Sequence, residues 1–199
     1  MSLGHTILTT PGIVLGKRGV GEANTLAVLF TRDRGLLYAK AQSSRLSRSK
    51  LRYFLEPLSI ARFSLVRGKH EWKIVNGHQH EKDRAQFAES SRDARHAVGK
   101  ILQLLTRLIH GEEASPALYD QVVEGIGLLL TARSREEVDG IESVLVLRTL
   151  HHLGYLPKTP ELAPFIGDSA LSMELAASAA VSRSALIRSI NESLMATGL

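Results

Sequence analysis

The sequence predicts an α+β protein of two domains, a small antiparallel β-barrel over residues 1–80 and an all-α helical bundle over residues 81–199. Residues 5–77 show the period-2 alternation of apolar side chains that is typical of strands. From about residue 83 the apolar side chains take the spacing of helices. The charge changes in the same region, because residues 1–80 hold 13 Lys and Arg against four Asp and Glu, a net +9, whereas residues 81–199 hold 12 against 16, a net −4.

The first domain should contain five short strands. We expect them at residues 7–15, 26–31, 36–41, 58–67 and 72–75. Pro11-Gly12 predicts an edge position or a bulge in the first strand. The glycine-rich run at residues 16–21 is expected to be a flexible hairpin loop, and Asp33-Arg34-Gly35 a turn. Five strands in about 75 residues, with no room for crossover helices, favour a small barrel, of which the OB-fold is one kind.

The second domain should be an antiparallel bundle of helices joined by short loops. The stripe of apolar side chains from Ala97 to Leu108 predicts one helix, with Gly111 beyond its end. Residues that commonly precede a helix predict four more starts, at Ser115 before Pro116, at Ser134 with Glu137 three residues later, at Asp168 and at Ser182. Between the helix that starts at Ser134 and the one that starts at Asp168, Pro157, Pro160 and Pro164 indicate a rigid connector.

Several classes of function are excluded or disfavoured by the composition. The chain has no cysteine, which excludes disulfides, thiolate metal sites and a cysteine nucleophile. Its longest apolar runs are too short to span a bilayer, so we expect a soluble, cytoplasmic protein. The glycine-rich run lacks the Gly-Lys-Ser/Thr of a phosphate-binding loop, and residues 78–81 (HQHE) lack further spaced metal ligands. We therefore expect no enzyme, no cofactor and no metal.

The positive charge of the first domain predicts a nucleic-acid interface. Seven basic residues and a single acid lie between Arg32 and Arg52, interleaved with serines. Guanidinium groups and hydroxyls suit phosphate oxygens, and an aromatic ring can stack on an unpaired base. The residues expected to contact nucleic acid are Lys17, Arg18, Arg32, Arg34, Lys40, Arg45, Arg48, Lys50, Arg52 and Tyr53. The alternative interpretation is a solvated basic loop with its aromatic rings in the core, where large rings are usually found.

Several short runs, in order, resemble a known family. They are Gly12-Ile13-Val14-Leu15, Gly21-Glu22-Ala23, Leu29-Phe30-Thr31-Arg32, Gly35-Leu36-Leu37, Leu55-Glu56-Pro57-Leu58, Leu65-Val66-Arg67-Gly68, Leu147-Arg148 and Leu153-Gly154-Tyr155-Leu156-Pro157. Their order and spacing resemble RecO, a family of bacterial DNA-repair proteins. The likeness is closest over residues 5–77 and looser over residues 83–167.

The resemblance implies an N-terminal OB-fold, a helical C-terminal domain and a recombination mediator without enzymatic turnover. Such a protein binds single- and double-stranded DNA, anneals complementary strands, engages the C-terminal tail of single-stranded-DNA-binding protein (SSB) and, with RecR, helps to load RecA. It would be associated with the nucleoid. Cations on the helical domain would meet the carboxylates of the SSB tail, and Arg107, Arg133 and Arg148 are the candidates, together with Arg135.

The sequence departs from the family at one place. Many relatives begin a four-cysteine zinc site shortly after the Gly-Tyr-x-Pro run, and here Ala163 and Ile166 stand where thiolates would. The resemblance therefore implies that the zinc site is absent and that apolar packing replaces it. It also implies a chain that is short at its C-terminal end.

Two other functions remain open from the residues themselves. The barrel could be a protein-interaction adaptor that binds an acidic partner, because small barrels serve many functions. It could also be an RNA-binding module without annealing activity, since stacking and phosphate contacts accept both polymers.

Overall fold

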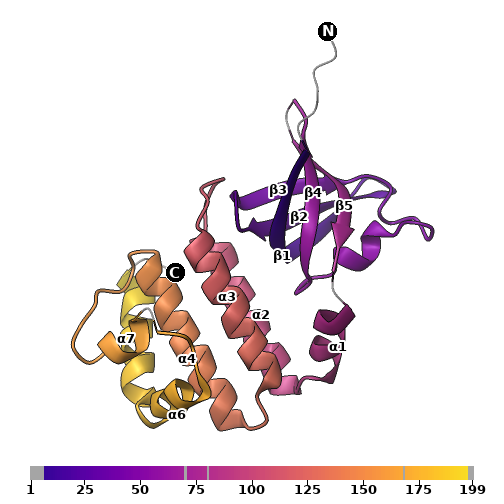
Figure 1. Ribbon diagram of the computed structural model, residues 1–199. Helices are drawn as coiled ribbons and strands as arrows, with labels where there is room; N and C mark the ends of the chain where they lie inside the picture. The colour runs from indigo at the N-terminus through magenta and orange to yellow at the C-terminus, as the bar shows by residue number, and fades with distance from the viewer. Residues whose placement is uncertain (1–6, 70, 80, 168, 197–199) are drawn as a thin grey trace. The chain divides into compact units, whose positions relative to one another are not determined.

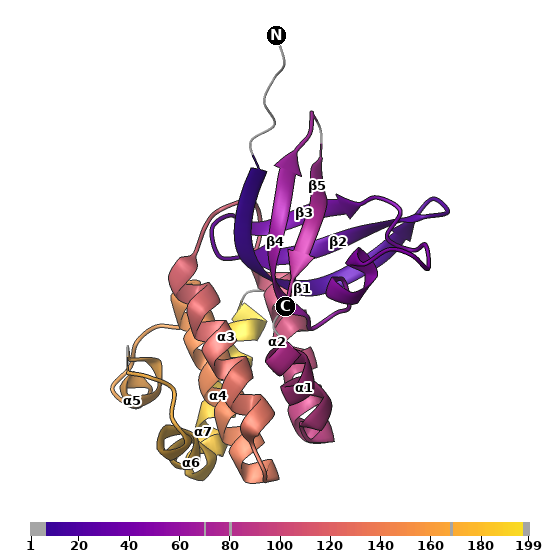
Figure 2. The same cartoon turned by 45° about the vertical axis from the view of Figure 1, so that its right-hand side comes forward.

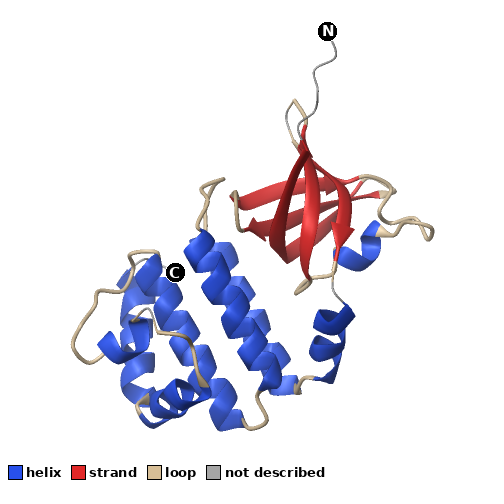
Figure 3. Cartoon of the chain, in the orientation of Figure 1, coloured by secondary structure: helices blue, strands red, loops and turns tan. Residues whose placement is uncertain are grey.

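The computed structural model describes residues 7–69, 71–79, 81–167 and 169–196. The chain forms two compact units. Unit 1 comprises residues 1–85 and 109–119, and unit 2 comprises residues 86–108 and 120–199. All the strands lie in unit 1, whereas unit 2 is built from helices (Figure 3). Among the described residues, no helix combines the length and the apolar character that crossing a bilayer requires.

Unit 1 is a closed five-stranded barrel (Figure 1). Its strands are β1 (Ile7–Val20), β2 (Asn24–Thr31), β3 (Gly35–Ala41), β4 (Ile60–Arg67) and β5 (Trp72–His78). They follow one another around the barrel as β1-β2-β3-β5-β4, and β4 pairs back onto β1. Every pairing is antiparallel except the short parallel one between β3 and β5. This confirms the predicted α+β fold class, with an OB-type barrel before the helices.

The glycine-rich run at residues 16–21 is mostly strand, so the prediction of a loop there was wrong. β1 continues to Val20, and Lys17 and Gly19 pair with Ala27 and Thr25 of β2. The chain turns later, at residues 21–23, where Gly21 has a φ of 60°. Glycine-rich composition suggested a loop, but hairpin pairing uses only backbone groups and tolerates these residues. Only Gly21 supplies the left-handed conformation that the turn uses.

Pro11 takes the predicted edge position, whereas the bulge lies elsewhere. Its carbonyl accepts a hydrogen bond from the Arg32 backbone N–H at 3.0 Å, beyond the end of β2, so the missing proline N–H interrupts no pairing with β2. The register shift in β1 falls between Val14 and Gly16. The fourth strand also begins later than predicted, because Leu58 has a φ of 76° and belongs to a turn.

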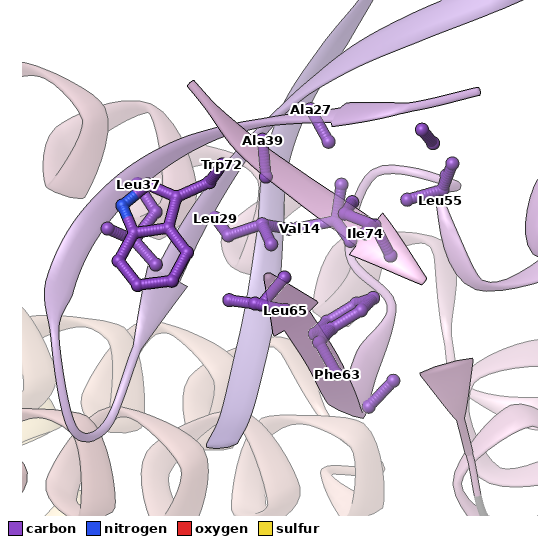
Figure 4. Packing of buried hydrophobic residues seen from close by; sticks show 12 residues of the cluster. Val14, Ala27, Leu29, Leu37, Ala39, Leu55, Phe63, Leu65, Trp72 and Ile74 are labelled. Carbon is purple, nitrogen blue, oxygen red and sulfur yellow. The ribbon is translucent and has the colours of Figure 1, made fainter. Parts of the chain in front are cut away.

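The barrel core is formed by inward side chains from all five strands. Figure 4 shows Val14, Ala27, Leu29, Leu37, Ala39, Phe63, Leu65, Trp72 and Ile74 converging there, together with Leu55 from the β3–β4 connection. Several inner positions of β2 and β3 are alanines, which leaves room for the larger Phe63 and Trp72. A short 3-10 helix, η1 (Leu51–Phe54), lies in the same connection.

A segment from the helical part of the sequence completes unit 1. Residues 109–119 pack on the outside of the barrel beside β3. Leu36 donates its backbone N–H to the Gly111 carbonyl at 3.0 Å, and the rings of Phe30 and Tyr119 lie 5.5 Å apart. Phe30 is therefore buried on the outer face of β2, although it points away from the barrel core.

The helices begin and end close to the predicted signals with three exceptions, one of which is the short α5 inside the predicted proline connector. Their bounds are α1 (Glu81–Glu89), α2 (Arg92–Leu108), α3 (Pro116–Thr131), α4 (Arg135–His152), α5 (Ala163–Ile166), α6 (Met173–Val181) and α7 (Arg183–Ala196). α1 is a separate helix that the apolar spacing did not distinguish from α2. Asp168, the predicted cap, lies outside the described residues, and α6 is instead capped by the Ser172 side chain, which accepts from the Leu175 N–H.

Helix α4 is the centre of unit 2, with α2 on one side and α6 and α7 on the other (Figures 1 and 2). Ser134 and Glu137 form the predicted capping box at its start. Its buried residues occupy most of its circumference, which is typical of a helix enclosed by neighbours. Gly140 of α4 lies against the backbone of Ala176 in α6, so these two helices approach closely.

Candidate nucleic-acid interface

A row of basic side chains crosses the outer face of the barrel. Arg18 of β1 pairs with Leu26 of β2, Leu26 with Lys40 of β3, and Lys40 with Lys73 of β5. Paired residues on adjacent strands point to the same side of a sheet. The neighbours of Lys40 and Lys73 along their strands, such as Ala39 and Ile74, belong to the barrel core, so both lysines face outward.

An aromatic ring lies beside this row. Tyr38 precedes Lys40 by two residues on β3, pairs with Val28 and has 56% of its surface exposed. An exposed ring next to cations provides a stacking surface for an unpaired base. We call Arg18, Tyr38, Lys40 and Lys73 the cationic face. OB-folds bind oligonucleotides at this place, on the face of their second and third strands between the β1–β2 and β4–β5 loops.

The charges of the cationic face are only partly balanced. Lys40 and Lys73 are directly opposite in the β3–β5 pairing, where like charges repel. The carboxylate of Glu71 lies 3.6 Å from the Lys40 ammonium and offsets part of this repulsion. A phosphate bound between the two lysines would relieve the rest, which is a reason to expect a polyanion here.

The connection between β3 and β4 holds five more of the predicted residues. The Arg45 guanidinium donates to the Gly21 carbonyl at 3.1 Å, so this side chain lies over the β1–β2 turn. The Arg52 guanidinium stacks over the ring of Tyr53 at 4.6 Å and donates to its hydroxyl at 2.8 Å. Arg48 and Lys50 are exposed. Arg52 and Tyr53 together present a planar cation and a half-exposed ring.

The other predicted residues do not join these two groups. Lys17 forms an ion pair with Glu56 at 2.8 Å. Arg32 lies 3.8 Å from the carboxylate of Asp33, and Arg34 is exposed. Both arginines belong to the β2–β3 turn, at the other end of β2 from Arg18. The structure thus brings some of the predicted cations together on one face and separates Arg32 and Arg34 from them.

Lys73 was missed by the sequence analysis. It lies outside the basic run, in the strand predicted at residues 72–75. Its position between the inward-facing Trp72 and Ile74 was the available signal, because alternation places the intervening side chain outside.

The candidates for partner binding in unit 2 differ in exposure, and Arg135, at the start of α4, is exposed. Arg107 and Arg133 are exposed, at the end of α2 and between α3 and α4. Arg148 is only 5% exposed, and its Nε donates to the Phe165 carbonyl of α5 at 2.8 Å. It also donates to the Ser169 hydroxyl at 3.3 Å. Arg148 therefore fastens the short α5 to the central helix α4.

Replacing Arg148 by Met should lower the free energy of unfolding by about 2 kcal/mol, because the Phe165 carbonyl loses its buried donor while the apolar stem is kept. Arg107→Gln, on an exposed side chain, is the control and should leave stability unchanged. Chemical denaturation followed by circular dichroism measures both. An Arg148→Met protein as stable as the native one would contradict the structural role of this arginine.

No group of three or more His, Cys, Asp or Glu suited to a metal occurs among the described residues. His78 belongs to β5, and His80 lies outside the part of the chain that the structure describes.

The family model and three relatives that match this chain all bear the name of recombination or DNA repair protein RecO. Residues 1–78 match the family model for the N-terminal domain of recombination protein O. The chain is 26% identical over 165 residues to a DNA repair protein RecO of Thermoanaerobacter, covering 76% of this chain and 60% of that protein. It is 30% identical over 146 residues to one of Heliobacterium modesticaldum, covering 73% of this chain and 51% of that protein. A RecO of Caldanaerobacter subterraneus is 27% identical over 163 residues, 75% of this chain and 59% of its own length. The chain thus spans between half and three fifths of the length of these three relatives.

Proposed function

Since this chain belongs to the RecO family, whose N-terminal domain model matches residues 1–78, we propose that it acts in DNA repair and recombination as a DNA-binding mediator. The observation that carries the proposal is the cationic face, on which three cations and an exposed tyrosine lie on the side of the barrel where OB-folds bind oligonucleotides. Backbone phosphates would contact Arg18, Lys40 and Lys73, while an unpaired base stacks on Tyr38. These contacts bind DNA without reading its sequence.

The basic connection between β3 and β4 would extend this interface. Arg48 and Lys50 are exposed and free to meet further phosphates, and the stacked pair of Arg52 and Tyr53 offers a second surface for a base. A surface that holds strands by their backbones, and leaves base edges accessible, is suited to annealing of complementary strands. We expect no covalent step, and the protein would work with the nucleoid DNA of the cytoplasm.

The protein partners are part of the same proposal. We propose that unit 2 binds the acidic tail of SSB, and that the chain acts with RecR to help load RecA. Arg107 and Arg133 are exposed and can meet carboxylates. Arg148 is engaged with α5 and is not expected to take part.

An annealing assay tests the function directly. The chain should accelerate annealing of bare complementary oligonucleotides. When the same strands are coated with SSB, it should accelerate their annealing only if the SSB keeps its C-terminal tail. The Arg18, Lys40 and Lys73→Gln protein should lose the acceleration on bare strands. Absence of any acceleration on bare strands would contradict the annealing function, and faster annealing of RNA than of matched DNA would favour an RNA-binding role.

A further inference from the structure

A carboxylate of the chain itself accepts hydrogen bonds from two side-chain donors at one end of the barrel. Glu112, in the segment between α2 and α3, accepts from the Arg67 guanidinium at 2.6 Å and from the Trp72 indole N–H at 3.1 Å. The Arg67 guanidinium also lies over the Trp72 ring, 5.1 Å from its centroid. All of these residues belong to unit 1.

The two donors can bind only an acceptor. Neither a guanidinium nor an indole N–H has a lone pair to offer, and the fork of an arginine fits a carboxylate or a phosphate equally. Stacking on Trp72 holds the Arg67 guanidinium in place, so the donor pair is formed in advance of any ligand. These contacts describe a small anion site that is filled by Glu112.

This anion site lies at the end of the barrel next to the cationic face, but on the inner side of the strands, because alternation turns Trp72 inward and Lys73 outward. Arg67 and Trp72 are paired across β4 and β5, at the ends of the two strands that the β4–β5 loop joins. Trp72 directly precedes Lys73, whose ladder neighbour is Lys40. A strand of nucleic acid that follows this face and bends over the loop at the end of the barrel would bring a phosphate to Arg67, whose side chain is 63% exposed.

We propose that Arg67 and Trp72 form a further phosphate site, and that Glu112 occupies it until a DNA phosphate displaces the carboxylate. This inference rests on the proposed binding of DNA by the cationic face. Glu112 thus competes with nucleic acid and lowers its affinity. The site adds one phosphate contact to those of Arg18, Lys40 and Lys73.

Displacement is feasible because the ion pair lies at the surface. The side chains of Arg67 and Glu112 are 63% and 40% exposed, and exposed ion pairs contribute at most about 1 kcal/mol. The segment does not depend on Glu112 alone, since Gly111 accepts from Leu36 and Tyr119 packs on Phe30. The carboxylate can therefore leave the site while residues 109–119 stay on the barrel.

The test compares Glu112→Ala with Glu113→Ala, two variants of the full chain that remove the same charge from neighbouring positions. Glu113 is exposed, and among the described side-chain contacts it is not a partner of Arg67. Binding of a fluorescent oligo-dT is measured by anisotropy over a range of salt. Glu112→Ala should bind about fivefold tighter at ~0.1 M salt, because no exposed ion pair has to break before the phosphate reaches Arg67.

Two further variants test whether the gain comes from Arg67. Adding Arg67→Gln to Glu112→Ala should abolish the gain, and Glu112→Gln, which keeps the shape of the side chain, should show part of it. Equal binding by Glu112→Ala and Glu113→Ala, or weaker binding by Glu112→Ala with an unchanged melting temperature, would overturn the inference. If the native chain binds no DNA at any salt, the proposed function itself fails, and this inference fails with it.

Discussion

Replacing Arg18, Lys40 and Lys73 together by Gln should weaken binding of single-stranded DNA by about a hundredfold at ~0.1 M salt. The three residues form one row across β1, β3 and β5, so a single strand can meet all of them. Each neutralised phosphate on a single strand releases about 0.7 of a counterion, which three contacts turn into about two decades of affinity at this salt concentration. Anisotropy of a labelled oligonucleotide measures the change.

The matched control removes the same charge from unit 2. Arg92, Lys158 and Arg188 are exposed and lie on α2, in the connector after α4 and on α7. Their replacement by Gln should weaken binding only by the small, long-range effect of net charge. Equal losses from the two triple variants would show that total charge governs binding and would contradict a dedicated face.

Gly140→Ala should destabilise unit 2 by about 3 kcal/mol, at the upper end of the cost of overpacking a core. A Cβ at this position would overlap the carbonyl oxygen of Ala176 and lie 2.8 Å from its carbonyl carbon. The obstruction is backbone, so no change of side-chain rotamer relieves it, and α4 and α6 must move apart. Thermal unfolding followed by the helical circular dichroism signal measures the loss.

Gly99→Ala is the control, and its expected effect has the opposite sign. Gly99 lies inside α2, and a Cβ there would meet nothing within 4 Å outside its own helix. Alanine in a helix interior is favoured over glycine by about 0.8–1 kcal/mol, so this variant should be more stable than the native chain. A Gly140→Ala protein with the same unfolding temperature as the native chain would show that α4 and α6 are not held this closely.

Local signals in the sequence predicted much of the fold. The capping box of Ser134 and Glu137 fixed the start of α4, because both bonds form within one turn. Pro116 opens α3 as its composition suggested. Alternation in β2 and β3 identified the strands, because barrel cores select one side chain in two.

Features that depend on distant segments could not be predicted in this way. Phe30 is buried on the outer face of β2 by Tyr119, which lies almost ninety positions later in the sequence. Lys73 joins Lys40 only because β3 and β5 pair, which depends on barrel closure. Arg148 looked like a surface cation, and its burial follows from the position of α5. Glu112 gave no signal at all, since its partners lie in the barrel.

The salt dependence of binding tests the role of the cationic face most directly. We expect log K of the native chain for a single strand to fall steeply with log salt, and the Arg18, Lys40 and Lys73→Gln variant to lose about two units of that slope. Parallel lines for the two proteins would mean that these side chains release no ions on binding, and would contradict a phosphate-neutralising barrel.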